Sequence, residues 1–248
     1  MKGNSPARQP RRVAHDIVAR EVQVARVEAV SPRFRAVTFT GESLSGFASP
    51  SFDDHVKFMF QDASGQTVRR DYTPRRFDPA SRELTLEFGL HGGGLSSSWA
   101  RQAQPGQAAV IAGPKGSLII PADYEWHVLA GDCSALPAIS RRLEELPPGV
   151  LTYAVVQLDD PRDQRAFAPK AGQIVQWTFS TEEFLSTLRS IPASLPGEGF
   201  VWCAGEASAM LAARHLFLEE RGLPPASARI AAYWKKDSAG YHENLVAH

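Results

Sequence analysis

EWHVLAGDCSALPAISRRLEEL, residues 125–146, joins an apolar strand directly to a segment with helical periodicity. The strand ends at Gly131-Asp132 and the helical segment starts at Ser134. A strand that passes into a helix in this way begins a βαβ unit, whose parallel strands are covered by helices on both faces. The alternation continues downstream, with apolar strands expected at 151–158, 174–179, 199–205 and 228–234 and helices expected at 181–189 and 206–222. Residues 123–248 are therefore predicted to form an α/β domain with a parallel sheet.

The residues before this stretch have the period of β structure instead. Segments that alternate apolar and polar residues, or are apolar throughout, lie at 21–30, 34–40, 55–60, 83–88 and 108–113. Short strands separated by Gly, Pro, Ser and Asp at this spacing predict a small antiparallel β-barrel or a β-sandwich, of which we expect the barrel. One short helix is expected at 96–103, with a serine as its N-cap. PADYE (121–125) is the expected boundary, so the barrel domain is predicted over 15–122.

The composition is that of an ordinary globular protein of one or two domains, with 248 residues, 43% hydrophobic and 22% charged. Lys plus Arg and Asp plus Glu number 27 each, so the formal net charge is zero, which argues against nucleic-acid binding. We find no signal peptide and no apolar run long enough for a membrane span, and we expect a cytoplasmic protein. Residues 1–14, rich in basic residues, Gly and Pro, are expected to form a disordered tail.

Neither the cysteines nor the histidines have the spacing of metal ligands. Cys133 and Cys203 are too far apart in sequence to suggest a disulfide framework. Six of the seven histidines are expected to be solvated or structural: His15, His55, His127, His215, His242 and His248. No metal site and no catalytic acid or base is predicted.

RRDYTPRRFDP, residues 69–79, concentrates arginines beside an aromatic ring. In a strand, Arg70 and Tyr72 would lie on the same face. A guanidinium donates paired, charge-assisted hydrogen bonds to a pyrophosphate, and an aromatic side chain packs against a flat heteroaromatic ring. The Thr73 hydroxyl would reach a ring nitrogen. The segment alone is also compatible with a charged surface strand, in which Arg69 and Arg76 are ordinary surface charges.

GLHGGGLSSSWA, residues 89–100, places three glycines and three serines at the expected start of a helix. Glycine lets the backbone approach phosphate oxygens, and the first turn of a helix offers free N–H donors. A flexible loop with a serine cap is the alternative. Together with the arginine-rich strand, this segment predicts a dinucleotide site in the barrel, although the G-x-G-x-x-G fingerprint is absent.

These motifs have a common precedent, because the chain resembles the siderophore-interacting protein family of flavin-dependent ferric-siderophore reductases, which are related to ferredoxin reductases. The resemblance is carried by seven collinear segments: DDHVKFMF (53–60), RRDYTPRRFDP (69–79), HGGGLSSSWA (91–100), AGPKGS (112–117), AGDCSALPAI (130–139), WCAGEASAM (202–210) and YWKK (233–236). It implies a ferredoxin-reductase-like fold and residue roles in both halves. The implied FAD-binding residues are Arg70, Tyr72, Thr73, Arg75, His91, Gly92, Gly93, Gly94, Ser96 and Ser97. The residues implied on the NAD(P)H side are Asp132, Ser134, Ala135, Gly205, Glu206 and Trp234.

The implied reaction is reduction of Fe(III) in a siderophore by NAD(P)H through FAD, with release of Fe(II). Ferric siderophores are often anionic, so Lys57, Lys235 and Lys236 are candidate substrate-binding residues, and Arg75 is ambiguous between flavin phosphate and substrate. The alternatives are a ferredoxin-linked reductase, a general flavin or ferric-chelate reductase, and a non-enzymatic siderophore-binding protein.

The chain departs from the family pattern at two places. Cys133 and Ser134 stand where an acidic residue and a threonine are usual, and Lys235-Lys236-Asp237 stands where Arg followed by Gly is usual. The choice between NADH, NADPH and ferredoxin stays open. Arg162 and Arg165 could meet a 2′-phosphate, whereas the neighbouring Asp159 and Asp160 would oppose it.

Overall fold

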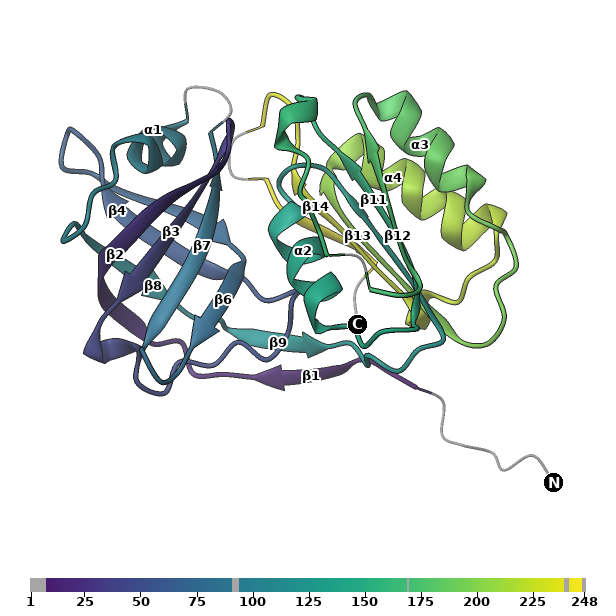
Figure 1. Ribbon diagram of the computed structural model, residues 1–248, viewed down its shortest axis with the longest axis horizontal. Helices are drawn as coiled ribbons and strands as arrows, with labels where there is room; N and C mark the ends of the chain where they lie inside the picture. Colours follow the sequence, from purple (N-terminus) through teal and green to yellow (C-terminus); the bar gives the residue numbers. More distant parts are fainter. Residues whose placement is uncertain (1–7, 91–93, 169, 239–240, 247–248) are drawn as a thin grey trace.

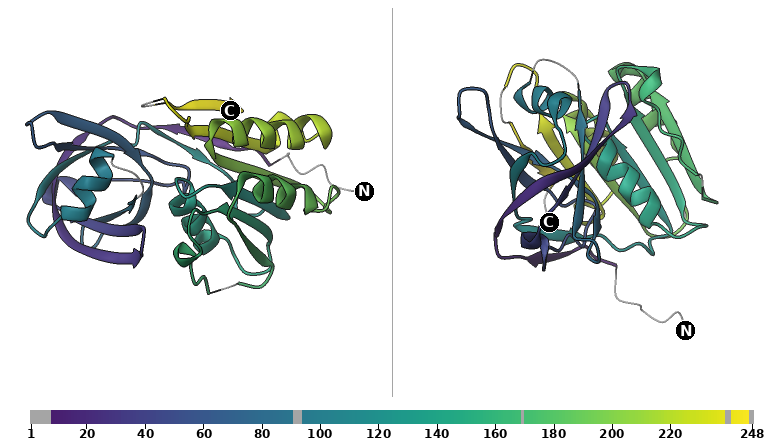
Figure 2. Two further views of the ribbon diagram at one scale, coloured as in Figure 1. Left: turned by 90° about the horizontal axis from the view of Figure 1, so that it is seen from above. Right: turned by 60° about the vertical axis from the view of Figure 1, so that its left-hand side comes forward.

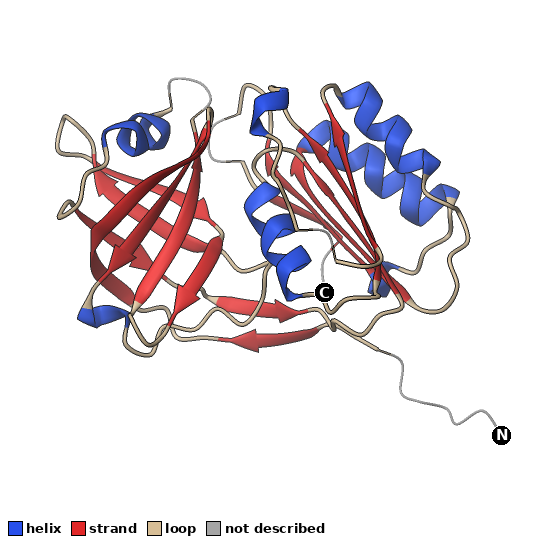
Figure 3. Cartoon of the chain, viewed as in Figure 1, coloured by secondary structure: helices blue, strands red, loops and turns tan. Residues whose placement is uncertain are grey.

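The computed structural model describes residues 8–90, 94–168, 170–238 and 241–246. Two sheet domains lie side by side, with the antiparallel sheet on the left and the helix-covered sheet on the right in Figures 1 and 3. A two-stranded ribbon of β1 (Arg11–Ala14) and β9 (Gly116–Ile119) runs beneath both of them.

The first domain is a curved antiparallel sheet of seven strands in the order β5-β4-β8-β2-β3-β7-β6. Its elements are β2 (Ala19–Ser31), β3 (Phe34–Thr40), the short helix η1 (Glu42–Leu44), β4 (Val56–Gln61), β5 (Thr67–Tyr72), β6 (Pro74–Asp78), β7 (Glu83–Gly89), helix α1 (Leu95–Gln102) and β8 (Ala108–Ala112). The Phe58 ring lies at the centre of its core, 4.7 Å from Trp99 and 5.2 Å from Phe88 between ring centroids. This aromatic packing fixes α1 against the barrel, as the sequence predicts for an antiparallel barrel with one short helix.

The second domain is a six-stranded sheet in the order β12-β11-β10-β13-β14-β15. Its strands are β10 (Trp126–Gly131), β11 (Leu151–Gln157), β12 (Gln173–Thr178), β13 (Gly199–Glu206), β14 (Ala228–Trp234) and β15 (Glu243–Val246). Its helical segments are α2 (Leu136–Glu145), η2 (Pro161–Asp163), α3 (Thr181–Ser190), α4 (Ala207–Arg214), η3 (His215–Glu220) and η4 (Pro225–Ser227). The first five strands are parallel, and β15 is added antiparallel to β14.

Helices cover both faces of this sheet because successive strand residues point to opposite sides. On β10, Leu129 packs in the cluster that contains α2, whereas Val128 and Ala130 pack in the cluster that contains α3 and α4. The two views in Figure 2 show α2 on the side of the barrel and α3 and α4 on the other side. The strand ends therefore meet the barrel in a space that α2 borders.

Several local features differ from the sequence-based expectations. The N-cap of α1 is Gly94, with no side-chain capping bond, rather than a serine. The helix expected over 206–222 is α-helical only to Arg214 and continues as a π-helix to Glu220. Arg11–Ala14 pairs with β9, so the expected disorder is wrong for these residues, because the backbone groups of β9 need a partner. Residues 1–7 of that tail lie outside the described residues.

Buried polar contacts hold the two domains together. Asp53, in the loop before β4, accepts hydrogen bonds from Trp202 Nε1 at 2.8 Å and from Arg229 Nε at 3.2 Å. Glu87 on β7 lies between Arg75, at 3.2 Å, and Arg165, at 2.8 Å. Side chains this buried form such ion pairs only when their geometry is well fixed, so the space between the domains has defined walls.

Candidate functional site

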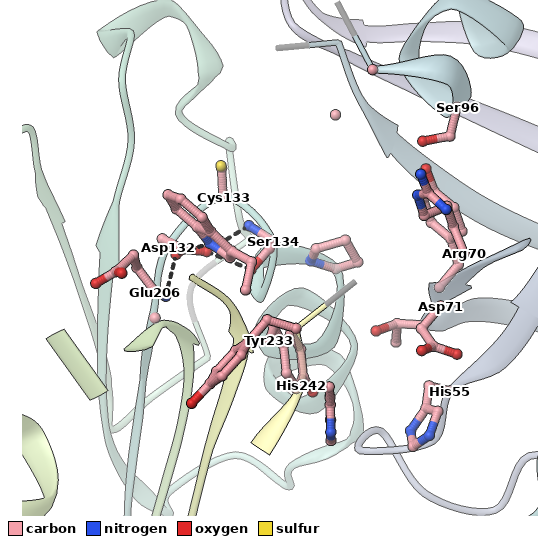
Figure 4. Close-up of a pocket in the computed structure, with 18 of the residues that line it drawn as sticks. His55, Arg70, Asp71, Ser96, Asp132, Cys133, Ser134, Glu206, Tyr233 and His242 are labelled. Atoms are coloured by element: carbon pink, nitrogen blue, oxygen red, sulfur yellow. Dashed lines mark hydrogen bonds between the residues drawn. The ribbon is translucent and has the colours of Figure 1, made fainter. Parts of the chain in front are cut away.

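A cavity of about 820 Å³ lies between the two domains, at the carboxyl ends of β10, β13 and β14. Figure 4 shows residues of the barrel and of the α/β domain facing each other across it. Ligands of open parallel sheets bind beyond this edge of the strands, and the volume is within the usual range for cofactor sites.

The barrel wall of the cavity contains the residues of the arginine-rich strand. Arg70 and Tyr72 of β5 and the adjacent Thr73 all line it. The Tyr72 ring packs 4.3 Å from Phe88 between centroids. Burial raises the pKa of Tyr72 to about 12, although a hydrogen bond with Ser96 and the charge of Arg70 act against the rise. Among the described residues, no carboxylate lies within ion-pair distance of Arg70, so its guanidinium is available to an anion.

The N-terminus of α1 opens into the same wall. Gly94, Ser96 and Ser97 line the cavity, and the Ser97 hydroxyl donates to the Gly89 carbonyl oxygen at 2.7 Å. Gly94 has no side chain that could cap the helix, so it does not satisfy the backbone N–H groups of the first turn of α1. His91, Gly92 and Gly93, predicted to bind phosphate, lie outside the described residues.

The opposite wall is organised by the partly buried carboxylate of Asp132. It accepts hydrogen bonds from Ser134 N at 2.8 Å, from Ser134 Oγ at 2.5 Å, from Glu206 N at 2.8 Å and from Trp234 Nε1 at 2.8 Å. Burial raises the pKa of Asp132, and these four donated bonds oppose that rise because they favour the carboxylate. Asp132 thereby connects the ends of three adjacent strands.

Glu206 and Ser134 also line the cavity, and Glu206 has a second structural role. The Glu206 carboxylate caps α4 by accepting a hydrogen bond from Ser208 N at 2.6 Å. Gly205 packs against Asp132, where an added Cβ would lie 2.7 Å from Asp132 Oδ2, at a φ of +155°. Ala135 is fully buried beneath the wall. Gly205 and Ala135 therefore shape the site from behind, and their direct contact with the donor nucleotide stays a prediction.

Three other predicted site residues are engaged elsewhere. Arg75 contacts Glu87 and Glu144 in the domain interface and is not among the residues that line the cavity, so its role as a ligand of the cofactor stays a prediction. Lys235 lies over the Tyr241 ring at 5.6 Å, and neither it nor Lys236 lines the cavity. Arg69, expected to be a surface charge, does line it.

The lower end of the cavity in Figure 4 holds charged groups and two histidines. Lys57 lines it, as predicted for a substrate-binding residue, and pairs with Asp71 at 2.6 Å. His55 from the barrel domain and His242 from the α/β domain lie there with ring centroids 5.9 Å apart. Sequence reasoning missed both histidines, since their distance along the chain gives no local signal.

Cys133 lines the cavity beside Asp132 and is a free thiol. Burial raises its pKa, and the nearby Asp132 and Asp159 raise it further. The thiol is therefore protonated and unreactive at neutral pH. Within the described ranges, we found no group of three or more His, Cys, Asp and Glu side chains that could hold a metal ion.

The barrel wall fits FAD. A pyrophosphate requires an unpaired guanidinium and free backbone donors, and the wall offers Arg70 and the first turn of α1. A flavin ring requires an aromatic surface and adjacent hydroxyl groups, and Tyr72, Thr73 and Ser96 line the same wall.

Comparison with known proteins gives the same result. The model of the siderophore-interacting FAD-binding domain matches residues 23–69 and 64–118, and the model of the siderophore-interacting protein family matches residues 124–237. The chain belongs to the siderophore-interacting protein family. It is 35% identical to the NADPH-dependent ferric-chelate reductase of Escherichia coli (strain K12), over 93% of this chain and 98% of that protein. It is 30% identical to the ferric vibriobactin reductase ViuB of Vibrio cholerae, over 92% and 94% of the two chains.

Solved structures of this family have the same fold. A siderophore utilization protein from T. fusca superimposes with a TM-score of 0.88 at 30% identity, covering 94% of this chain and 98% of that chain. A ferredoxin reductase of carbazole 1,9a-dioxygenase, at 17% identity and a TM-score of 0.67, shares the fold over 87% and 69% of the two chains. The expected ferredoxin-reductase-like architecture is confirmed. No helix in the described part of the chain is long and apolar enough to cross a membrane.

Proposed function

We propose that this protein reduces ferric siderophores to release Fe(II), using NAD(P)H as electron donor and FAD as cofactor. One observation carries the proposal: a single cavity brings together the arginine and tyrosine of β5, the start of α1 and the strand ends of the α/β domain. A flavin reductase requires this juxtaposition, because donor and acceptor must both approach one cofactor. FAD supplies the conversion between two-electron and one-electron transfer.

The residues of the barrel wall would hold the cofactor. The guanidinium of Arg70 would bind the pyrophosphate, together with backbone donors at the N-terminus of α1. Tyr72, held by Phe88 and Phe58, would pack beside the cofactor, and Thr73 would donate its hydroxyl. These contacts orient the cofactor toward the opposite wall.

The α/β wall would position the nicotinamide donor. Asp132 fixes the Trp234 indole and the backbone at Ser134 and Glu206, so this wall has a defined shape before any ligand binds. Preorganisation of this kind lowers the entropic cost of placing two reactants in contact.

Lys57 is the cation that would attract an anionic ferric chelate. It is about half-exposed, at 54% of its side-chain surface, and it forms an ion pair with Asp71. Lys57→Met should raise the KM for an anionic ferric chelate and leave the KM for a neutral acceptor unchanged. Lys170→Met is the matched control, because Lys170 binds backbone carbonyls at the end of α2 and does not line the cavity.

The activity is tested by anaerobic incubation of the FAD-loaded protein with NADH or NADPH and a ferric catecholate or hydroxamate complex, with Fe(II) captured by a coloured Fe(II)-specific chelator. The proposal predicts that two Fe(II) form for each NAD(P)H oxidised, in keeping with the two electrons of hydride. Rapid reduction of free flavin or ferredoxin without Fe(II) formation would instead indicate a flavin or ferredoxin-linked reductase.

A further inference from the structure

Two histidines from different domains face each other at the end of the cavity that holds Lys57 and Asp71. His55 precedes β4 in the barrel, and His242 precedes β15 in the α/β domain. Their ring centroids are 5.9 Å apart, and His242 stacks on Tyr233 at 5.8 Å with an interplanar angle of 21°. Figure 4 shows both imidazoles at the end of the cavity opposite Ser96. Both side chains are exposed to solvent, so they can exchange protons with water.

We propose that His55 and His242 form a shared proton donor for the oxygen atoms of the ferric chelate as its iron is reduced. The proposal rests on the proposed function, and it assigns a catalytic role to residues that the sequence analysis placed among solvated or structural histidines.

The chemistry requires a proton at this point. One electron, derived from NAD(P)H, reduces Fe(III) to Fe(II). An Fe–O bond then breaks, its electron pair stays on the chelate oxygen, and that oxygen takes a proton from the imidazolium. The imidazole regains a proton from a solvent water, which leaves hydroxide in solution, so charge and atoms balance. Without protonation, the free oxyanion would bind iron again.

Two phenols, one thiol and the Asp132 carboxylate that also line the cavity are poorly suited to this role. Burial raises the pKa of the Tyr72 and Tyr233 phenols and of the Cys133 thiol, which makes them weak acids. The Asp132 carboxylate is fully engaged as an acceptor. A general acid is most effective when its pKa is near the working pH, and histidine is the side chain whose ordinary pKa meets that condition.

Charged groups of both domains surround the pair. Partial burial lowers the pKa of His242, and the nearby His55 and Arg229 lower it further, whereas Asp71 and Asp53 act in the opposite direction. Repulsion between two imidazolium charges at this separation opposes a second proton on the pair. The protonated form of an imidazole, which donates the proton, becomes more abundant as the pH falls.

The test uses FAD-loaded protein that has been reduced in advance and is then mixed rapidly with one of two acceptors. A ferric catecholate takes up protons when its iron is released, whereas ferricyanide accepts an electron without taking up a proton. For the His55→Ala/His242→Ala double variant, we expect the rate with ferric catecholate to fall at least about tenfold and to lose its rise at low pH. The rate with ferricyanide should stay within about twofold of wild type, and added imidazole should restore part of the catecholate rate.

His215→Ala is the matched control, because His215 is an exposed histidine on η3 that pairs with Glu219 away from the cavity. Binding of a redox-inert Ga(III) catecholate should be the same in wild type and in the double variant. An equal loss of rate with both acceptors, an unchanged rate with catecholate, or weaker Ga(III) binding that accounts for the loss would each overturn the proton-donor role. Failure of the wild-type protein to reduce any ferric chelate would contradict the proposed function as well.

Discussion

The indole Nε1–H of Trp234 donates a hydrogen bond to the carboxylate of Asp132 at 2.8 Å, although the two residues belong to different strand ends. The same carboxylate accepts from the backbone of Ser134 and of Glu206. One side chain thus fixes the adjacent ends of β10, β13 and β14, which form the α/β wall of the cavity.

Asp132→Asn should damage this wall. The amide presents an NH2 group to donors that require an acceptor, so we expect the free energy of unfolding to fall by about 1–3 kcal/mol. Binding of NAD(P)H should weaken, while the FAD content stays normal. Urea denaturation and titration with the donor nucleotide measure the two effects. Asp159→Asn is the control, because Asp159 lines the same cavity but is 59% exposed, and it should leave stability unchanged. Equal stability of the two variants would refute the role of Asp132.

Arg70→Ala should weaken FAD retention. A charge-assisted hydrogen bond to a phosphate contributes about 1.5–3 kcal/mol, which corresponds to a loss of affinity of at least about tenfold. Equilibrium dialysis against FAD measures the dissociation constant. Arg76→Ala serves for comparison, because Arg76 is 72% exposed and does not line the cavity. If both variants retained FAD equally well, Arg70 would have no role in binding it.

Glu87→Gln should destabilise the joined domains. It leaves Arg75 and Arg165, which are both largely buried, without the carboxylate between them. Breaking a buried ion pair from one side costs about 3–5 kcal/mol, which chemical denaturation can resolve. Glu83→Gln breaks a more exposed pair with Arg26 at the start of the same strand and should cost no more than about 1 kcal/mol. Similar losses of unfolding free energy in the two variants would show that Glu87 stabilises the domain interface no more than an exposed ion pair stabilises the barrel.

Acid should destabilise the protein partly through His127. This residue is 1% exposed, and its pKa is lowered to about 3, mainly by burial and next by the charge of Arg142. Between about pH 6.5 and pH 3 the unfolded chain binds a proton that the folded protein excludes, so stability falls as pH falls. The expected loss is about 2 kcal/mol between pH 6.5 and pH 5. His127→Gln should flatten this dependence and His215→Gln should not; a slope unchanged by either variant would rule His127 out as the cause.

We expect the end of β11 to favour NADH over NADPH. Arg162 is held by Asp160, with Nη2 2.6 Å from Oδ2, and Arg165 is bound to Glu87. Arg33 lies within 3.5 Å of Asp159, which lines the cavity and would repel a 2′-phosphate. We expect kcat/KM to be higher for NADH, although the Escherichia coli relative is named NADPH-dependent. Asp159→Ser should shift the ratio toward NADPH by about tenfold. A preference for NADPH in the wild-type protein would contradict this assignment.

The sequence predicted those parts of the fold that depend on local periodicity. The strands at 34–40 and 83–88 and the helix at 181–189 appear as β3, β7 and α3 with almost the same bounds. The strand β15 and the pairing of β1 with β9 were not predicted, because an edge strand is defined by its distant partner rather than by its own residues.

The same distinction applies to the site. Arg70 and Tyr72 could be placed on one face of a strand by alternation alone, and both line the cavity. The sequence could not distinguish Arg75 from these two cavity residues, because its partners Glu87 and Glu144 come from another strand and from the other domain. His55 and His242 meet only because the two domains are packed together.

The central claim is that electrons pass from NAD(P)H to a ferric chelate through FAD in this one cavity. Anaerobic stopped-flow spectroscopy tests it directly, by mixing the FAD-loaded protein first with NADH or NADPH and then with a ferric catecholate. The account predicts that flavin absorbance is lost in the first step and recovers in the second, at a rate that rises with chelate concentration and with Fe(II) formed in proportion. A protein that binds no FAD, or whose reduced flavin persists in the presence of the ferric chelate, would contradict it.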